Sequence, residues 1–170
     1  MSKAFTRESD DAPEPLLRLR PSSPLPPGAK NYITAEGLRE LQAELNHLKE
    51  IERPKFIIGP EDPDARRQLQ IIDQQIEQLD ESLATAVVVP SPAQPWDQVL
   101  FGATVTVRGR GSGETSYRLV GVDETDLDQN WVSWLSPIAR ALLNARLGQR
   151  VRFKFPSGEE ELEIVRIDYE

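Results

Sequence analysis

Three carboxylates near the middle of the chain are the residues best suited to metal chemistry. Glu61, Asp62 and Asp64 surround Pro63, and carboxylate oxygens of this kind can ligate magnesium or orient a water molecule for hydrolysis. A structural role also explains them, because Asp62 is a good helix N-cap, Pro63 suits the first helical position and Asp64 favours a helix N-terminus. We favour the structural role, and both interpretations stay open on the residues alone.

No other group of residues supports autonomous catalysis. His47 is the only histidine and the chain has no cysteine, which leaves no catalytic triad and no zinc-binding cluster. Gly109, Gly111 and Gly113 resemble a phosphate-binding loop only in composition, since no Lys-Ser or Lys-Thr pair follows them, and we expect a hairpin turn there. We therefore expect a protein that is not an enzyme and that holds no metal or cofactor of its own.

Two stripes of leucine and isoleucine predict the element that would present the three acids. Each stripe repeats at alternating spacings of three and four residues, which is typical of a helix with one apolar face. The segment 59–64 between the stripes contains two prolines and cannot be helical throughout. The pattern predicts an antiparallel coiled-coil helical hairpin with an apolar seam and an acidic tip. The stripe residues are Leu38, Leu41, Leu45 and Leu48, followed by Leu69, Ile72, Ile76, Leu79 and Leu83.

Capping residues and prolines predict where the two helices begin and end. Thr34 is a good N-cap for the first helix, which we expect to run to about Glu52. Arg53-Pro54 should kink this helix or end it, because proline has no backbone N–H to donate. We expect the second helix to begin after Asp62 and to run to about Ala86.

The C-terminal half changes to short alternating runs, which predict strands. We expect a small twisted antiparallel sheet and one short helix over a face of it, with Ser136 as the helix cap and Pro137 in the first turn. The fold class is therefore α+β, a helical hairpin followed by a small sheet domain. The predicted strands are 99–107, 115–122, 131–135, 150–155 and 161–169, and the predicted helix is 136–145.

Proline-containing segments divide the chain into three predicted parts. Residues 1–30 are rich in proline and predict a flexible leader. Residues 31–90 form the coiled-coil hairpin, in which 87–89 lead into a second linker. Residues 97–170 form the sheet domain.

Composition restricts the partners and the location that we expect. The chain has no apolar run of about eighteen residues that would cross a membrane, and its first residues lack the apolar core of a secretory signal. Because there is also no cysteine, we expect a cytoplasmic protein without membrane association. The net charge of −8 argues against unaided, sequence-specific DNA binding, which needs a basic face. We expect a monomer.

Several segments match one protein family in order and spacing, and on them the chain resembles the bacterial Gre transcription elongation factors. The resemblance covers about residues 27–170 and is strongest to the B-type branch. The matching segments are 27–34 (Pro-Gly-Ala-Lys-Asn-Tyr-Ile-Thr) followed by Glu36-Gly37, then 101–105 (Phe-Gly-Ala-Thr-Val), 120–124 (Val-Gly-Val-Asp-Glu) and 136–143 (Ser-Pro-Ile-Ala-Arg-Ala-Leu-Leu).

The resemblance implies a partner and a set of binding residues. Gre factors place an FKBP-like domain at the mouth of the RNA polymerase secondary channel and extend their coiled coil into the channel. Their acidic tip helps to hold the second magnesium and a water in the polymerase active site, and the polymerase then hydrolyses its own backtracked transcript. For this chain, the resemblance implies docking on the polymerase β′ rim helices through Leu135, Ser136, Pro137 and Arg140. It also implies a magnesium ion shared with the polymerase.

The tip departs from the family pattern. Gre factors carry a Gly-Asp-x-x-Glu-Asn-type stretch on a longer hairpin, and that stretch is absent here. Matching Arg53-Pro54 on one side and residues 83–86 on the other leaves this hairpin about a dozen residues shorter, which is roughly 10 Å of reach. A metal ligand must lie within about 2–2.6 Å of its ion. We therefore expect a factor that binds the polymerase channel and modulates transcription, or competes with true Gre factors, without stimulating cleavage.

Two other hypotheses stay open. In one, the protein is an active cleavage factor in which Glu61 or Asp64 holds the second magnesium. In the other, the hairpin pairs with a different protein and the chain no longer binds polymerase.

Overall fold

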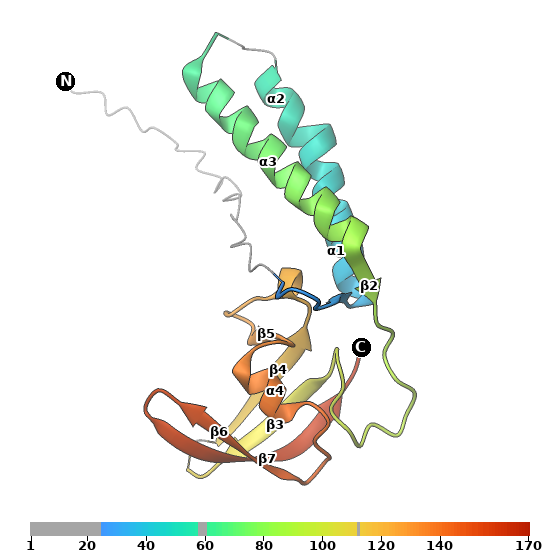
Figure 1. Cartoon of the computed structure of the whole chain (residues 1–170), viewed down its shortest axis with the longest axis vertical. Helices are drawn as coiled ribbons and strands as arrows, with labels where there is room; N and C mark the ends of the chain where they lie inside the picture. Colours follow the sequence, from blue (N-terminus) through green and yellow to red (C-terminus); the bar gives the residue numbers. More distant parts are fainter. Residues whose placement is uncertain (1–24, 58–60, 112) are drawn as a thin grey trace, which may run out of the picture.

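The computed structural model describes residues 25–57, 61–111 and 113–170, in which a long helical hairpin is attached to a small curled sheet (Figure 1). Most of the predicted leader, residues 1–24, lies outside the described residues. No helix in the described segments is long and apolar enough to cross a membrane. The hairpin consists of α1 (Ala35–His47), the π-helical segment η1 (Leu48–Glu52), α2 (Arg53–Ile57) and α3 (Pro63–Thr85).

The apolar seam of the hairpin confirms the predicted helical stripes except at Leu69, which is not part of the buried cluster. Its most buried side chains form a cluster of their own, separate from the core of the sheet. Two exposed ion pairs cross the seam, Lys49–Asp80 at 2.9 Å and Arg53–Asp73 at 2.6 Å, and such exposed pairs add little to stability. Burial therefore supplies most of the free energy that holds the two arms together. The buried members are Ile33, Leu41, Leu45, Leu48, Ile72 and Leu79.

Both helix starts follow the predicted capping. The hydroxyl of Thr34 accepts a hydrogen bond from the N–H of Gly37 at 3.0 Å. The carboxylate of Asp62 accepts from the N–H of Asp64 at 3.0 Å, and Pro63 occupies the first turn of α3. α3 ends at Thr85, one residue before the predicted end.

The interruption expected at Arg53-Pro54 takes the form of a π-helical turn, and the helix continues to Ile57. The N–H of Arg53 donates to the carbonyl of Leu48, five residues earlier. This wider turn accommodates Pro54, which has no backbone N–H to donate to a carbonyl of the preceding turn.

A short parallel pairing joins the two ends of the hairpin, where the sequence predicted only a linker. Strand β1 (Asn31–Ile33) pairs in register with β2 (Ala86–Val88). The N–H of Val89 extends the pairing to the carbonyl of Ile33 at 2.9 Å. The side-chain amide of Asn31 also donates to the carbonyl of Ser82, at 3.1 Å, near the end of α3. Both arms are thus fixed to each other at the base.

The C-terminal part is a five-stranded sheet in the order β5-β4-β3-β7-β6. All neighbours are antiparallel except β4 and β5, which run parallel. The prediction of a wholly antiparallel sheet is wrong here, because residues 121–130 carry the chain back past the end of β4 before β5 begins. The strands are β3 (Thr104–Gly109), β4 (Gly113–Val120), β5 (Trp131–Ser133), β6 (Arg150–Phe155) and β7 (Gly158–Asp168).

One helix, α4 (Pro137–Leu142), covers a face of this sheet as predicted. Ile138, Ala139 and Leu142 are buried among the inward-facing side chains of β3, β4 and β7. The glycine-rich segment is the predicted turn between β3 and β4, in which Gly109 pairs with Gly113.

We expect Ile72→Ala to lower the free energy of unfolding by about 2–5 kcal/mol, because this fully buried side chain would leave a cavity in the seam. The matched control is Ile51→Ala, whose side chain is 50% exposed and should change that free energy by only about 0.5 kcal/mol. Chemical denaturation of the whole protein measures both. Equal losses would contradict a packed seam.

Candidate functional site

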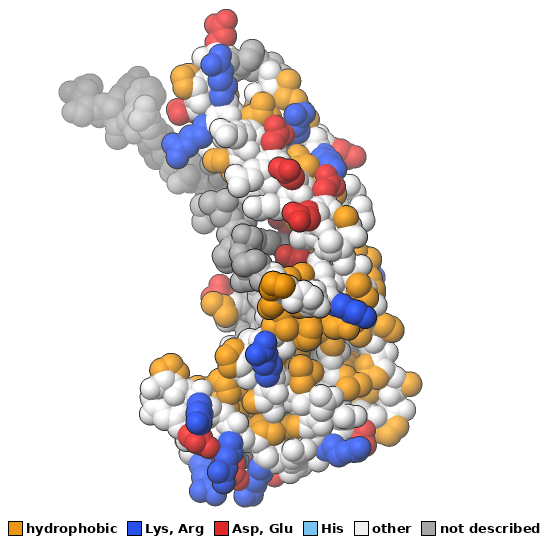
Figure 2. Space-filling view, in the orientation of Figure 1, with side chains coloured by type: hydrophobic (Ala, Val, Ile, Leu, Met, Phe, Trp, Pro, Cys, Tyr) orange, Lys and Arg blue, Asp and Glu red, His pale blue; other side chains and the backbone are white. Residues whose placement is uncertain are grey.

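The three predicted tip acids lie together at the far end of the hairpin. Glu61, Asp62 and Asp64 are all exposed, and acidic side chains are visible at this end of the molecule (Figure 2). Asp62 is engaged as the cap of α3, whereas Asp64 lies in the first helical turn, where its charge suits the helix dipole. The structural role proposed for Asp62 is therefore observed, and Glu61 and Asp64 remain exposed to solvent.

The four predicted docking residues form one corner at the start of α4, which we call the docking corner (Leu135, Ser136, Pro137 and Arg140). The hydroxyl of Ser136 caps α4 by accepting from the N–H of Ala139 at 3.3 Å. Because the opposite side of the helix is buried against the sheet, Pro137 and Arg140 are exposed. Leu135 and Ser136 are half-buried. The docking corner therefore exposes a proline and a cation to solvent.

A third group of residues, for which the sequence predicted no shared role, fixes the hairpin to the sheet. One oxygen of the Glu124 carboxylate accepts from the N–H of Thr34 at 3.0 Å and from the N–H of Gly121 at 2.9 Å. The other oxygen accepts from the hydroxyl of Thr34. Thr34 is the N-cap of α1, so Glu124 binds the residue from which the hairpin helix starts. We call this contact, together with Glu36, Arg118 and Glu170, the hairpin–sheet junction.

Arg118 supplies the second polar contact of the hairpin–sheet junction. Its side chain is only 8% exposed, and it lies 2.8 Å from the carboxylates of both Glu36 and Glu170. The guanidinium also lies over the ring of Trp131, with its central carbon 4.6 Å from the ring centroid. The hydrogen bond from Arg118 is the main cause that lowers the pKa of Glu36 below its ordinary value.

Aromatic side chains complete the contact between the two parts. Tyr32, from β1, packs against Phe101 with ring centroids 5.8 Å apart and against Trp134 with centroids 5.0 Å apart. Hydrophobic side chains gather where the hairpin meets the sheet (Figure 2). The pairs are tilted, an arrangement that favours aromatic contacts beyond the area they bury.

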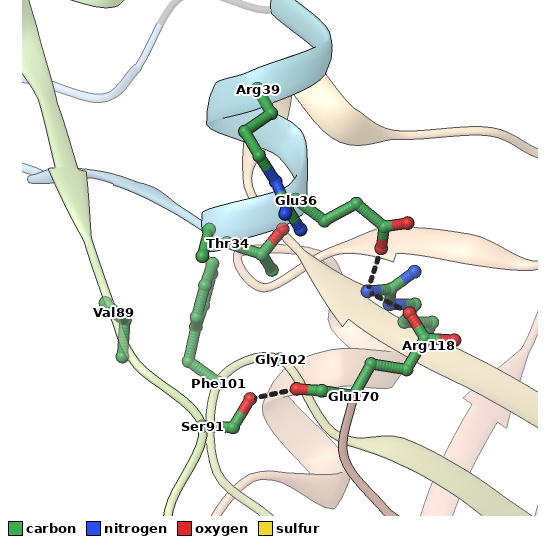
Figure 3. Close-up of a pocket in the computed structure, with 10 residues that line it drawn as sticks. Thr34, Glu36, Arg39, Val89, Ser91, Phe101, Gly102, Arg118 and Glu170 are labelled. Atoms are coloured by element: carbon green, nitrogen blue, oxygen red, sulfur yellow. Dashed lines mark hydrogen bonds and ion pairs between the residues drawn. The ribbon is translucent and has the colours of Figure 1, made fainter.

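A small cavity of about 160 Å³ opens at the hairpin–sheet junction (Figure 3). It is lined from both parts of the chain, by Thr34, Glu36 and Arg39 on the hairpin side and by Phe101, Arg118 and Glu170 on the sheet side. Two cations line it, Arg39 and Arg118, and Arg118 already has two carboxylate partners within the chain. Arg118 therefore contributes to the contact between the two parts of the chain.

His47 and the acidic residues offer no preformed metal site in the part of the chain that the structure describes. His47 lies on the hairpin surface, with its ring nitrogen 3.1 Å from Glu52. No three His, Cys, Asp or Glu side chains among the described residues are grouped to hold a metal ion.

Comparison with known proteins identifies the family. A family model described as the C-terminal domain of the transcription elongation factors GreA/GreB matches residues 93–169. The transcription elongation factor GreB of Neisseria meningitidis serogroup A is 41% identical over 155 residues, covering 82% of this chain and 94% of that relative. The chain belongs to the GreA/GreB family of transcription elongation factors.

Other Gre proteins are similar over nearly their whole length. The transcription elongation factor GreA of Alkalilimnicola ehrlichii is 37% identical over 156 residues, covering 83% of this chain and 99% of the relative. A solved GreA/GreB structure from Nitrosomonas europaea is 25% identical and covers 82% of this chain and all of its own, with a TM-score of 0.42. In this Gre-family chain, the segment matched by the family model contains the docking corner, Arg118 and Glu124 but not the hairpin.

The lowered pKa of Glu36 predicts a specific dependence of stability on pH. A carboxylate with a lowered pKa in the folded state stabilises the fold above its ordinary pKa of 4.5, and this contribution is lost as pH falls through the lowered value. The unfolding free energy of the parent should therefore decline on acidification below about pH 4.5, and that of Glu36→Gln should decline less. Thermal unfolding between pH 7 and pH 3 measures both, with Glu40→Gln on the same helix as control. Parallel curves for parent and Glu36→Gln would contradict the contact.

Proposed function

We propose that this Gre-family protein binds RNA polymerase at the secondary channel and modulates elongation, or competes with true Gre factors, without stimulating transcript cleavage. In this proposal the docking corner binds the β′ rim helices of the polymerase and the hairpin enters the channel. The protein is not itself an enzyme, acts as a monomer in the cytoplasm and requires no cofactor of its own. The sheet domain corresponds to the FKBP-like domain of the family.

The short hairpin is the observation that carries the proposal. The longer unbroken helix, α3, has 23 residues, which gives an arm of about 34 Å at 1.5 Å per residue. The alignment with Neisseria GreB spans 155 positions but takes in 82% of these 170 residues, about 139, so about 16 positions have no counterpart here. That difference is large enough to include the deficit of about a dozen residues inferred for the hairpin from the family pattern. On that inference the tip stops roughly 10 Å short of the polymerase metal centre.

The carboxylates at the tip also support a factor that does not stimulate cleavage. Two-metal hydrolysis needs carboxylate oxygens in direct contact with the ion. One of the three tip acids, Asp62, already accepts a backbone hydrogen bond as the cap of α3. The remaining pair, Glu61 and Asp64, is separated by the cap and by Pro63 and does not reproduce the family tip stretch.

The exposed acids favour one alternative function. Glu61 and Asp64 are unshielded at the end of the hairpin, and a deeper docking position would allow them to share the second magnesium with the polymerase. In that case the protein would be an active transcript-cleavage factor.

A transcript-shortening assay on backtracked polymerase distinguishes the two functions. We expect the purified protein alone to produce no shortening above the intrinsic rate, because its acids stop short of the metal. Added to reactions that contain an authentic GreB, it should reduce shortening as its concentration rises. Strong stimulation by the protein alone, lost in the Glu61→Ala, Asp64→Ala double variant, would establish the alternative.

The same assay tests the docking corner. Arg140→Glu should weaken the inhibition about tenfold or more, because it reverses an exposed charge at the proposed contact. The matched control is Arg152→Glu, which makes the same change at an exposed position on β6. Equal inhibition by both variants would place the polymerase contact elsewhere.

A further inference from the structure

The geometry points to Glu124 as a positioning residue that sets the direction in which the hairpin leaves the sheet domain. The inference about direction depends only on the contacts of this chain. Its consequence for transcription rests on the proposed function, because there the hairpin must point into a channel while the docking corner holds the rim.

Glu124 contacts the hairpin at the start of its first helix, α1, and not along the side of that helix. Its carboxylate binds both the N–H and the hydroxyl of Thr34, and the same hydroxyl caps α1 through Gly37. On the sheet side, the carboxylate also accepts from the N–H of Gly121, three residues before it. One side chain therefore holds the turn that follows β4 and the start of α1 at a fixed separation. Hydrogen bonds to a charged carboxylate are short and directional, so they define an orientation as well as a contact.

Two glycines permit this close approach, one from each part of the chain. A Cβ atom on Gly37 would lie 2.0 Å from a carboxylate oxygen of Glu124. A Cβ atom on Gly121 would lie 2.2 Å from the backbone oxygen of Tyr32 in β1 and 2.9 Å from the other Glu124 oxygen. All three distances are below any normal contact. At Gly121 the obstacle is the backbone of Tyr32, so a side chain there would push β1 and the sheet apart, whereas a side chain at Gly37 would displace the carboxylate of Glu124 from its position. Glycine within a helix destabilises it relative to alanine, so the close approach of Glu124 gives a reason for a glycine at position 37.

The remaining contacts join the two parts without defining the angle so strictly. The aromatic side chains of Tyr32, Phe101 and Trp134 pack in tilted or edge-on pairs, and such pairs tolerate centroid separations of about 4.5–7 Å, a wider range than a hydrogen bond allows. Among the ion pairs of Arg118, the one with Glu36 crosses between the two parts, through a long side chain that is 42% exposed. Loss of the Glu124 contacts should therefore leave the two parts attached while their relative direction becomes less well defined.

The length of the hairpin amplifies any change at its base. An arm of about 34 Å that rotates by 10° moves its tip by about 6 Å. That displacement is comparable with the shortfall in reach inferred for the tip. A small change at Glu124 would thus alter whether the hairpin fits a narrow channel.

Distance measurements between spin labels test the direction without polymerase. The chain has no cysteine, so Gln74→Cys on α3 and Lys154→Cys on β6, both at exposed positions, provide unique labelling sites. We expect one narrow distance distribution in the labelled parent. Glu124→Gln should broaden or shift it, because the amide nitrogen cannot accept the hydrogen bond that the second oxygen accepts from the Thr34 hydroxyl. Gly121→Ala should shift it by acting as a wedge.

Matched variants separate positioning from general destabilisation. Glu114→Gln removes another ion-paired carboxylate of the sheet domain, beside Arg108, and should leave the distribution unchanged. Thr34→Ser keeps the hydroxyl and should also preserve it. If Glu124→Gln does not fold, Glu124→Asp keeps the charge on a shorter side chain and should shift the distance. A distribution that stays narrow and unshifted in the folded Glu124 variant and in Gly121→Ala overturns the inference.

The transcription assay then tests the consequence. Unlabelled Glu124→Gln should inhibit GreB-driven shortening about tenfold less well than the parent, whereas Glu114→Gln should match the parent. If the parent itself does not inhibit, the proposed function fails while the distance result stands. If the distances change but inhibition does not, the direction of the hairpin has no role in the channel, and that part of the inference is overturned.

Discussion

The carboxylate of Glu124 supplies a constraint that hydrophobic burial alone does not. The hairpin and the sheet each have a separate buried core, and burial stabilises each without specifying how one should be oriented on the other, because the hydrophobic effect has no direction. Directional contacts at the hairpin–sheet junction provide that orientation. The carboxylate binds the cap of α1 on one side and the turn after β4 on the other. The orientation of one part on the other therefore depends on this kind of contact more than on the size of either core.

Features of the fold with a local cause could be predicted from the sequence. The leucine and isoleucine stripes predicted the seam, Asp62-Pro63 predicted the start of α3, and Ser136-Pro137 predicted the start of α4. The pairing of β1 with β2 could not be predicted, because each strand has three residues and more than fifty residues separate them. Val87 and Val88 are also both about 40% exposed, so no alternation marks the strand. The parallel β5 was missed because direction depends on the path of residues 121–130.

In the candidate site, too, residues close in sequence could be predicted and contacts between distant residues could not. The tip acids and the docking corner are contiguous in sequence, and each appears in the structure as a single cluster. The hairpin–sheet junction joins Thr34 and Glu124, which lie ninety residues apart, and no spacing rule connects them. One signal was nevertheless present: Gly37 occupies an early position of an otherwise good helix, where glycine is unfavourable. A glycine in such a place indicates that another part of the chain approaches closely, and here that part is Glu124.

The pairing of β1 with β2 has a consequence for synthesis on the ribosome. Both strands and both arms of the hairpin lie before residue 89, and their buried residues form a cluster without help from the sheet. Because the N-terminal parts of a nascent chain emerge and fold first, the hairpin can close and register its base while the sheet is still being translated. Glu124 emerges later and finds a completed α1 cap to bind. The two parts can then dock on a hairpin base that is already formed.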